Sequence, residues 1–336
     1  MIFLKRIIPL LLSLILLTSC AAVKPTEPVS RDIFAMDTYM TVTCMGDRAE
    51  EALDKAEAEI KRLDALLSVG NESSEISAIN RDGEGQVSDE SRSMIEKSIE
   101  IYNGTDGAFD ITVYPIMEAW GFTDGNFRIP DSAELTDLLS AAGTDKLTLD
   151  GDKITLGEGQ GIDLGGIAKG YTSDRLTEIF ADCGLDYGII SLGGNVQFYG
   201  AKPDGSPWRC GIKNPYNTED LIAVLTVDDV AVITSGGYER YFTGEDGNTY
   251  HHIIDPKTGI SADSGIVSAT IISKSGTLAD GLSTACFVMG VDKASEYWRT
   301  RSQDFDMVLV TESGEMYVTA GLEGKVETSC DVYIIK

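Results

Sequence analysis

The sequence predicts an α+β fold: one domain over residues 31–336, built from mixed, largely antiparallel sheets that are packed by helices. Helical and strand patterns are intermixed along the chain without a regular β–α–β rhythm, which disfavours a doubly wound parallel sheet. Hydrophobic residues make up 43% of the 336 residues, enough for one large core or two smaller ones. No repeat, low-complexity tract or linker divides residues 31–336.

Helices are predicted where apolar residues recur at helical spacing. Residues 48–67 place Ala52, Ala56, Ile60 and Leu63 on one face, which is typical of an amphipathic helix. In the next helical pattern Ser88 has the position of an N-cap, and Asn103-Gly104 ends it. The predicted helices cover residues 48–67, 88–102, 132–142, 169–182 and 275–289.

Strands are predicted where β-branched and apolar residues alternate or run together between turn residues. Asp150-Gly151-Asp152 and Ser313-Gly314 are turn sequences flanked by such runs, so each predicts a hairpin. The predicted strands cover residues 38–44, 188–192, 196–201, 221–227, 231–234 and 266–273, with hairpins over 147–156 and 305–319.

The first 30 residues carry a targeting signal. Lys5 and Arg6 form a positive start, and the apolar run over residues 7–17 is too short to span a bilayer. The small residues that follow end in Cys20, at the position where a bacterial lipobox carries its lipidated cysteine. We therefore expect a signal peptide over 1–19, lipidation of Cys20, a tether over 20–30, and a location at the extracytoplasmic face of the cell membrane. The alternative is a soluble secreted protein in which Cys20 is incidental.

Charge and cysteine content exclude several functions. The chain has 27 Lys and Arg against 54 Asp and Glu, a net charge of −27, so we expect no nucleic-acid partner. After Cys20, the cysteines form no C-x-x-C pair and no histidine lies near them in the sequence. A disulfide scaffold or a zinc site is therefore disfavoured, and we expect mostly small buried residues.

Three glycine-rich segments, residues 163–171, 191–195 and 234–238, are each suited to bringing backbone N–H groups close to an anion. None is a Walker loop or a strand-linked dinucleotide fingerprint. The structural alternative is three tight turns between strands.

Hard oxygen ligands are spaced one helical turn apart near the C-terminal end. Asp280 and Thr284 stand at i and i+4 of a predicted helix and share one face. A carboxylate and a hydroxyl suit Mg²⁺ that is held jointly with substrate phosphates. The alternative is a partly buried aspartate with a threonine that bonds to the preceding turn.

The sequence contains two histidines, His251 and His252, which are followed by Ile253-Ile254-Asp255-Pro256-Lys257-Thr258-Gly259. An enzyme that needs a base near neutral pH has little choice beyond this pair. The alternative is a strand end with Pro-Lys-Thr-Gly as its turn.

Taken together, these segments resemble the FAD:protein FMN transferase family, the ApbE-like flavin transferase lipoproteins. The resemblance covers residues 31–336, and its motifs occur in the family's order. They are residues 34–38, 107–113, 163–171, 191–195, 234–236, 252–259 and 279–285. The resemblance implies a T-fold-like catalytic domain that splits FAD with Mg²⁺ and transfers FMN to a Thr or Ser hydroxyl of a target protein through a phosphoester, releasing AMP.

The resemblance also assigns residues to roles. It implies that Mg²⁺ is bound by Asp280, Thr284 and the carbonyl of Gly166, and that His252 assists proton removal. It further implies that FAD is contacted by Met36, Ala108, Phe109, Asp110, Asp163, Lys169 and Ile254. The implied partners are exported flavoproteins, such as subunits of the Na⁺-translocating NADH:quinone reductase or of the Rnf complex.

Other functions stay open on the sequence alone. The same site could hydrolyse FAD to FMN and AMP with water as the acceptor. A non-catalytic flavin-binding lipoprotein would not need Asp280, Thr284 and His252, and the polar glycine-rich motifs argue against an adhesive role. The segment 280–285 also resembles the acceptor motif of flavinylated proteins, although the helix-and-metal interpretation explains it better.

Overall fold

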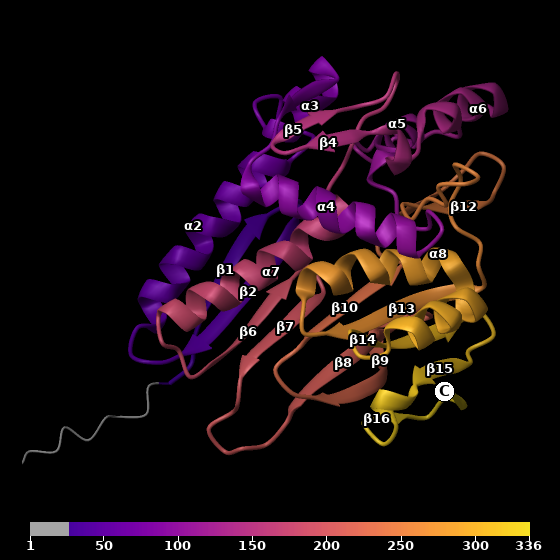
Figure 1. Ribbon diagram of the computed structural model, residues 1–336. Helices are drawn as coiled ribbons and strands as arrows, with labels where there is room; N and C mark the ends of the chain where they lie inside the picture. Colours follow the sequence, from indigo (N-terminus) through magenta and orange to yellow (C-terminus); the bar gives the residue numbers. More distant parts are fainter. Residues whose placement is uncertain (1–26) are drawn as a thin grey trace, which may run out of the picture.

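The computed structural model describes residues 27–336, and its largest element is a nine-stranded sheet (Figure 1). The strand order is β1-β2-β6-β7-β10-β13-β14-β15-β17, and every adjacent pair is antiparallel except β15 and β17. The strands are β1 (Val29–Ala35), β2 (Thr38–Met45), β6 (Tyr187–Leu192), β7 (Asn195–Gly200), β10 (Ala231–Gly236), β13 (Ile266–Ser273), β14 (Phe305–Thr311), β15 (Met316–Thr319) and β17 (Val332–Ile335).

Three smaller sheets flank this one. One has the order β16-β9-β8, another β3-β5-β4, and the third is the ribbon β11-β12. Their strands are β3 (Glu84–Gln86), β4 (Thr148–Asp150), β5 (Lys153–Thr155), β8 (Trp208–Asn214), β9 (Asn217–Val227), β11 (Tyr241–Thr243), β12 (Thr249–His251) and β16 (Val326–Thr328).

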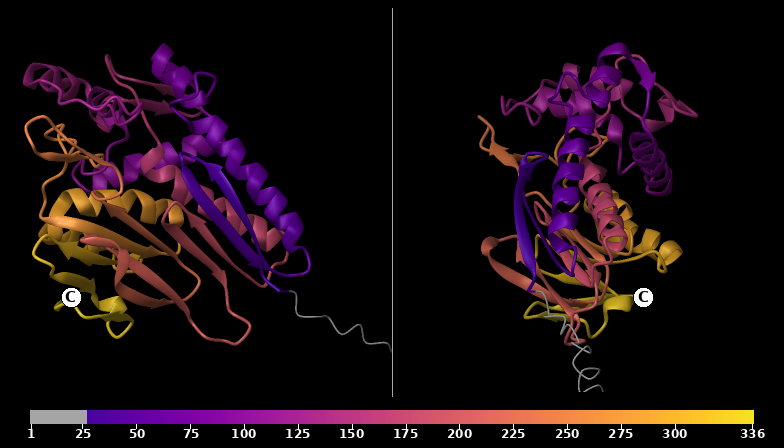
Figure 2. Two further views of the ribbon diagram at one scale, coloured as in Figure 1. Left: turned by 180° about the vertical axis from the view of Figure 1, so that it is seen from behind. Right: turned by 90° about the vertical axis from the view of Figure 1, so that its left-hand side faces the viewer.

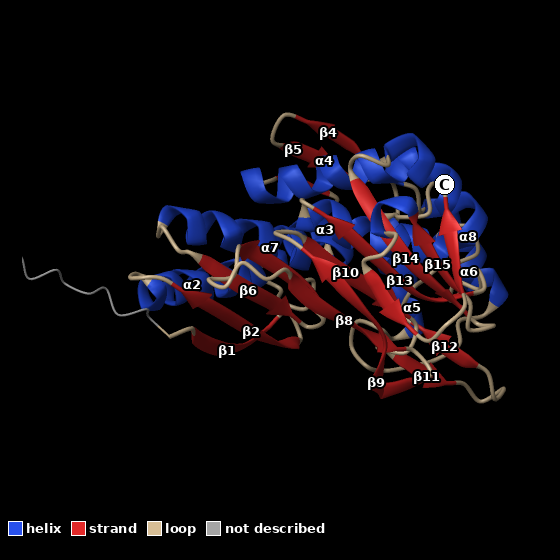
Figure 3. Ribbon diagram, turned by 90° about the horizontal axis from the view of Figure 1, so that it is seen from below, coloured by secondary structure: helices blue, strands red, loops and turns tan. Residues whose placement is uncertain are grey.

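The long helices lie along one face of the large sheet, as the right-hand view of Figure 2 and the view from below in Figure 3 show. Helices α2, α7 and α8 cover this face, and α4 packs on α7 and α8. The helices are α2 (Ala49–Leu67), α3 (Glu75–Asp82), α4 (Asp89–Gly104), α5 (Tyr114–Trp120), α6 (Ser132–Ala141), α7 (Gly165–Asp182) and α8 (Gly276–Arg301), with short 3₁₀ turns at Ile111–Val113, Thr144–Lys146 and Ala320–Leu322.

Apolar side chains fill both sides of the large sheet. On the helical side, α2 and α7 bury residues such as Ile60 and Phe180 against β1, β2 and β6. On the other side, β8 and β9 cover β7, β10, β13 and β14, with Trp208 stacked on Phe198 at 5.0 Å between ring centroids. The sheet is thus buried on both faces over its central strands, which explains their nearly continuous apolar sequences.

The predicted α+β class, with its largely antiparallel sheets, is confirmed. Helix 88–102 begins as predicted, since Ser88 caps α4 by accepting a hydrogen bond from the Ser91 amide. The predicted end of helix 275–289 coincides with a kink at Gly290, where φ is 77°, and the helical residues resume beyond it to Arg301. Both predicted hairpins form, as β4–β5 and β14–β15.

Several elements were not predicted. Strand β1 begins at Val29, inside the segment expected to be a tether. Burial alternates along β1, but its sequence VSRDIFA does not alternate between polar and apolar residues and so did not predict a strand. The short helices α3 and α5 and the edge strands β8, β16 and β17 were also missed. The predicted signal peptide, Cys20 and most of the tether lie outside the described residues.

Two further properties concern the described residues alone. No helix among them has the length and apolar composition that crossing a membrane requires. Their five cysteines are all free thiols, four of them buried and Cys330 half-buried, as the sequence predicted.

Candidate active site

Three motif-bearing turns meet at one end of the large sheet. Strand β1 leads to this end and turns back at Met36 and Asp37, whose φ values of 49° and 55° are typical of a two-residue hairpin turn. The β6–β7 turn at Gly193 and Gly194 lies beside it, since the Gly193 amide donates to the Tyr39 carbonyl at 3.2 Å. Strand β10 ends here as well, at Gly236.

Helices α7 and α8 cross behind this end at a glycine contact. A Cβ on Gly170 would lie 2.2 Å from the Gly276 carbonyl oxygen and 2.6 Å from the Asp280 Cβ. Asp174 of α7 binds the first turn of α8, accepting from the Gly276 and Thr277 amides at 2.7 and 2.9 Å. The crossing therefore fixes α8 against α7 and brings Asp280 to the N-terminal half of α7.

The Asp280 carboxylate is buried and held on both oxygens. Its Oδ2 accepts the Gly170 amide at 2.8 Å, and its Oδ1 accepts the Asn195 carboxamide at 2.9 Å. Burial raises the pKa of Asp280, while the Lys169 ammonium and the two donors counteract that rise. A buried carboxylate with free lone pairs and a raised pKa is well suited to a cation.

The other two predicted metal ligands lie on the same helices. In a regular α-helix the Gly170 amide would donate to the Gly166 carbonyl. Here the Gly170 amide donates its single proton to Asp280. The Gly166 carbonyl oxygen is therefore available to accept another partner. Thr284 is half-buried, and its hydroxyl lies 3.2 Å from that of Ser235. The residues present therefore fit Mg²⁺, which prefers few protein oxygens together with substrate phosphates.

Carboxylate or thiolate clusters do not offer a competing metal site. Within residues 27–336, no group of three or more His, Cys, Asp and Glu is placed to hold a metal ion. A metal at Asp280 would therefore depend on hydroxyl, carbonyl and ligand oxygens.

The Lys169 ammonium influences the pKa values of three titratable groups of the site. Burial raises the pKa values of Asp163 and Asp280 and lowers that of His252; the Lys169 charge opposes the two rises and adds to the lowering, although the three groups come from separate segments of the chain. Asp163 precedes α7 and accepts the Gly165 amide at 2.8 Å, and burial raises its pKa. Arg240, which the sequence analysis did not single out, acts on Asp163 and His252 in the same way as Lys169.

His252 is a neutral imidazole with an open nitrogen. Its Nδ1 lies 3.2 Å from the Arg240 carbonyl, which can only accept, so Nδ1 carries the proton and Nε2 keeps its lone pair. Burial, together with the Arg240 and Lys169 charges, lowers the pKa of His252 to about 3. At neutral pH the ring is a proton acceptor.

His251 has a different environment. Its ring packs edge-on against Phe287, with 5.4 Å between centroids, and its Nε2 lies 3.2 Å from the Ala262 carbonyl. Burial lowers the pKa of His251. This packing indicates that His251 contributes to stability.

The 107–113 segment lines the contact between the two crossing helices. The Phe109 ring is buried and lies 3.0 Å from where a Cβ on Gly166 would be, so glycine lets the ring pack closely on α7. The neighbouring Ala108 is buried as well. The Asp110 carboxylate is occupied within the protein, since Thr112 and Thr144 donate four hydrogen bonds to it. Its side chain stabilises this loop.

The remaining predicted FAD contacts flank the site. Met36 is half-buried, its amide donates to Asp64 at 3.1 Å, and its sulfur lies 3.9 Å from the Thr172 hydroxyl at the α7 surface. Ile254 is buried with Ile116, Trp120 and Phe122 under the ribbon β11–β12.

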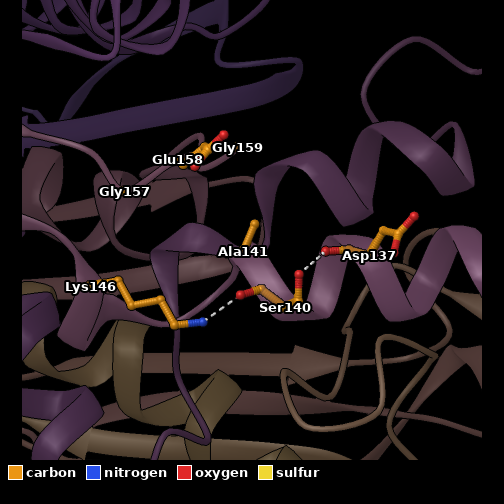
Figure 4. A pocket seen from close by; sticks show the side chains of 7 residues that line it. All are labelled: Asp137, Ser140, Ala141, Lys146, Gly157, Glu158 and Gly159. Atoms are coloured by element: carbon orange, nitrogen blue, oxygen red, sulfur yellow. Dashed lines mark hydrogen bonds between the residues drawn. The ribbon is translucent and has the colours of Figure 1, made fainter.

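Two surface pockets are present, one away from these residues and one beside the α7–α8 crossing. The first has a volume of about 530 Å³. Figure 4 shows Lys146 donating to the Ser140 carbonyl at the end of α6, and the same ammonium also donates to the Ala142 carbonyl. These two bonds hold the Lys146 ammonium at the C-terminal end of α6. The second, of about 330 Å³, is lined by residues of α4, α7 and the start of α8, including Lys97 and Arg175.

Comparisons with known proteins agree with this arrangement. The model of the ApbE family matches residues 36–309. A protein of Haemophilus influenzae named FAD:protein FMN transferase is 29% identical over 329 residues, covering 92% of this chain and 95% of its own. One of the same name from Klebsiella pneumoniae is 31% identical over 268 residues, covering 78% and 82%.

Solved structures show the same fold. The crystal structure of the ApbE protein of Thermotoga maritima has a TM-score of 0.83 at 33% identity, covering 89% of this chain and 99% of its own. The flavin transferase ApbE of Vibrio cholerae has a TM-score of 0.81 at 25% identity, covering 90% and 100%. With a family match over most of its length and a shared fold, the chain belongs to the ApbE family.

Proposed function

We propose that this protein is an FAD:protein FMN transferase. It splits FAD and joins FMN through a phosphoester to a Thr or Ser hydroxyl of a target protein, with AMP as the other product. The observation that carries this proposal is the convergence of Asp163, Lys169, His252 and Asp280 at one end of the sheet, linked by the Lys169 charge. Family membership and the names of the relatives support it.

The FAD diphosphate needs positive charge and close backbone approach. Lys169 supplies the charge, and the N-terminal turn of α7 at Gly166 supplies the backbone approach, since amides at a helix N-terminus favour anions. Asp280, Thr284 and the Gly166 carbonyl would hold Mg²⁺ beside them. When bound, the metal neutralises charge on the phosphate oxygens and orients them for displacement.

His252 supplies the proton acceptor. The hydroxyl oxygen of the target attacks the phosphorus of the FMN half, and its proton passes to Nε2 of His252. The bond between that phosphorus and the bridging oxygen breaks, and AMP leaves with the oxygen. The Nδ1 bond to the Arg240 carbonyl keeps Nε2 directed as the acceptor.

Substrate binding would also strengthen this base. The pKa of His252 is low partly because Arg240 and Lys169 lie near it. Two negative phosphates placed beside those cations offset their charge, so the His252 pKa rises toward the working pH. Proton transfer is then favoured when FAD is in place.

We further propose that Cys20 is lipidated and anchors the protein at the extracytoplasmic face of the cell membrane, where its targets are exported flavoproteins such as Rnf or Na⁺-translocating NADH:quinone reductase subunits. The chain enters the domain at Val29, and the seven residues of β1 lead from there to the site. At about 3.3 Å per residue, they separate the site from this entry by roughly 23 Å. The tether and the site therefore lie at opposite ends of β1.

The proposal is tested by incubating the protein with FAD, Mg²⁺ and an Rnf-type acceptor domain, followed by mass analysis of the acceptor. We expect one FMN on a Thr or Ser of the acceptor and an equal amount of AMP. FMN and AMP released in solution, with an unmodified acceptor, would contradict transfer and indicate FAD hydrolysis.

A further inference from the structure

Asn195 lies at the point where a glycine turn meets the Asp280 carboxylate. It is the first residue of β7, directly after Gly193 and Gly194, whose φ values of 62° and 99° form the turn. Its side chain is 5% exposed, and its Nδ2 donates to Asp280 Oδ1 at 2.9 Å. Because a carboxylate only accepts, the NH₂ group of Asn195 must face it.

The two oxygens of Asp280 are therefore held from two different elements. Asn195 of β7 binds one, and the Gly170 amide of α7 binds the other at 2.8 Å. Rotation of the carboxylate about its Cβ–Cγ bond would break both hydrogen bonds. Each oxygen keeps a further lone pair for a cation.

Gln197 is a second buried carboxamide, two residues further along β7, and it contacts a different carboxylate. Gln197 is 4% exposed, shares the face of Asn195, and donates to Asp174 at 3.3 Å. Asp174 in turn binds the first amides of α8. Gln197 thus supports the placement of the helix, whereas Asn195 contacts the carboxylate itself.

We propose that Asn195 is a positioning residue that holds the Asp280 carboxylate in its metal-binding orientation. This rests on the proposed function, which places Mg²⁺ at Asp280. Partners that orient a metal ligand change metal affinity by about 10- to 100-fold when they are removed. Asn195 does not touch the reacting phosphate and acts only through Asp280.

The test measures metal binding directly. Mn²⁺ is titrated into the full-length protein in the presence of ADP, a diphosphate that has no FMN to transfer, and free Mn²⁺ is followed by electron paramagnetic resonance. In Asn195→Ala and in Asn195→Leu, which fills the same space and keeps the packing, the Mn²⁺ affinity falls about 10- to 100-fold. Raised Mg²⁺ restores FMN transfer in both variants.

Gln197→Leu is the matched control, since it removes a carboxamide of equal burial from the same strand. It lowers the melting temperature but leaves the Mn²⁺ affinity within about twofold. An unchanged Mn²⁺ affinity in Asn195→Leu, or an equal loss in Gln197→Leu, would overturn the inference while the proposed function stands. A wild-type protein that retains no Mn²⁺ would overturn both.

Discussion

Replacing His252 by Asn tests both its charge state and its role. Asn keeps a donor for the Arg240 carbonyl but has no nitrogen that takes up a proton near neutral pH. The pKa of His252 is about 3 in the folded protein, against 6.5 for an ordinary histidine. The unfolded chain therefore takes up its proton first as the pH falls.

The sign and size of the effect follow from this difference. The pKa of His252 is lower in the folded protein than in the unfolded chain. Its contribution to folding stability is therefore fully present above pH 6.5 and is lost as the pH falls toward about 3. Each pH unit below 6.5 lowers the free energy of unfolding by about 1.4 kcal/mol. The decrease therefore reaches at most about 3 kcal/mol at pH 4.5. His252→Asn removes this loss, and its free energy of unfolding depends less on pH over that range.

Urea unfolding at pH 7.0, about 5.5 and about 4.5 measures the free energy of unfolding of the wild-type protein and of His252→Asn. Titration of the carboxylates affects both proteins equally, so it cancels when the two free energies are subtracted. The same samples are assayed for FMN transfer at pH 7, where loss of the general base lowers the rate about 10²–10⁴-fold with FAD still bound. Equal pH slopes for the two proteins would refute a His252 that is held neutral in the folded protein. Unchanged transfer would place the base elsewhere, with Asp255 or a water molecule as the next candidate.

Three more predictions concern the metal, the helix crossing and the anchor. Asp280→Asn keeps the shape of the buried side chain and removes its charge, so folding is retained while FMN transfer falls by about 10² or more; full activity in chelator would refute the assignment. Gly170→Ala forces a Cβ against Gly276 and should cost about 1–3 kcal/mol in urea unfolding, whereas Gly70→Ala, in open surroundings, should not. Cys20→Ser should move the protein from the membrane to the soluble fraction, and retention after a salt wash would contradict lipid anchoring.

Local patterns predicted most of the fold because the signals are strong where one face is buried. The helix 48–67 could be recognised from its apolar stripe, which packs on β1 and β2. The edge elements could not be recognised in this way. Strand β17 consists of four residues, two of them exposed tyrosine and valine, and its pairing with β15 is a long-range contact. Nothing local in the sequence encodes that pairing.

The sequence predicted which residue types form the site, but not which of them are hydrogen-bonded to one another. The spacing of Asp280 and Thr284 identified one helical face, and the glycine motifs identified close backbone approaches. The contacts of Asp280 with Gly170 and Asn195 join residues 110 and 85 positions apart. Arg240 was missed because an isolated arginine after a turn carries no motif, and its influence on His252 arises only from the folded ribbon.

The charges of the site lead to a last prediction, that Mg²⁺ and FAD bind cooperatively. The Asp163 and Asp280 carboxyls and the Lys169 and Arg240 cations lie close enough to shift one another's or His252's pKa. A diphosphate alone adds two negative charges to a partly buried site and Mg²⁺ alone adds two positive ones, whereas the two together add no net charge. FAD affinity, followed by flavin fluorescence, should therefore rise about 5- to 150-fold with saturating Mg²⁺, and by linkage FAD should raise Mg²⁺ affinity equally. Asp280→Asn should lose most of this coupling. A wild-type FAD affinity that does not change with Mg²⁺ would show that the metal and the diphosphate do not share this site.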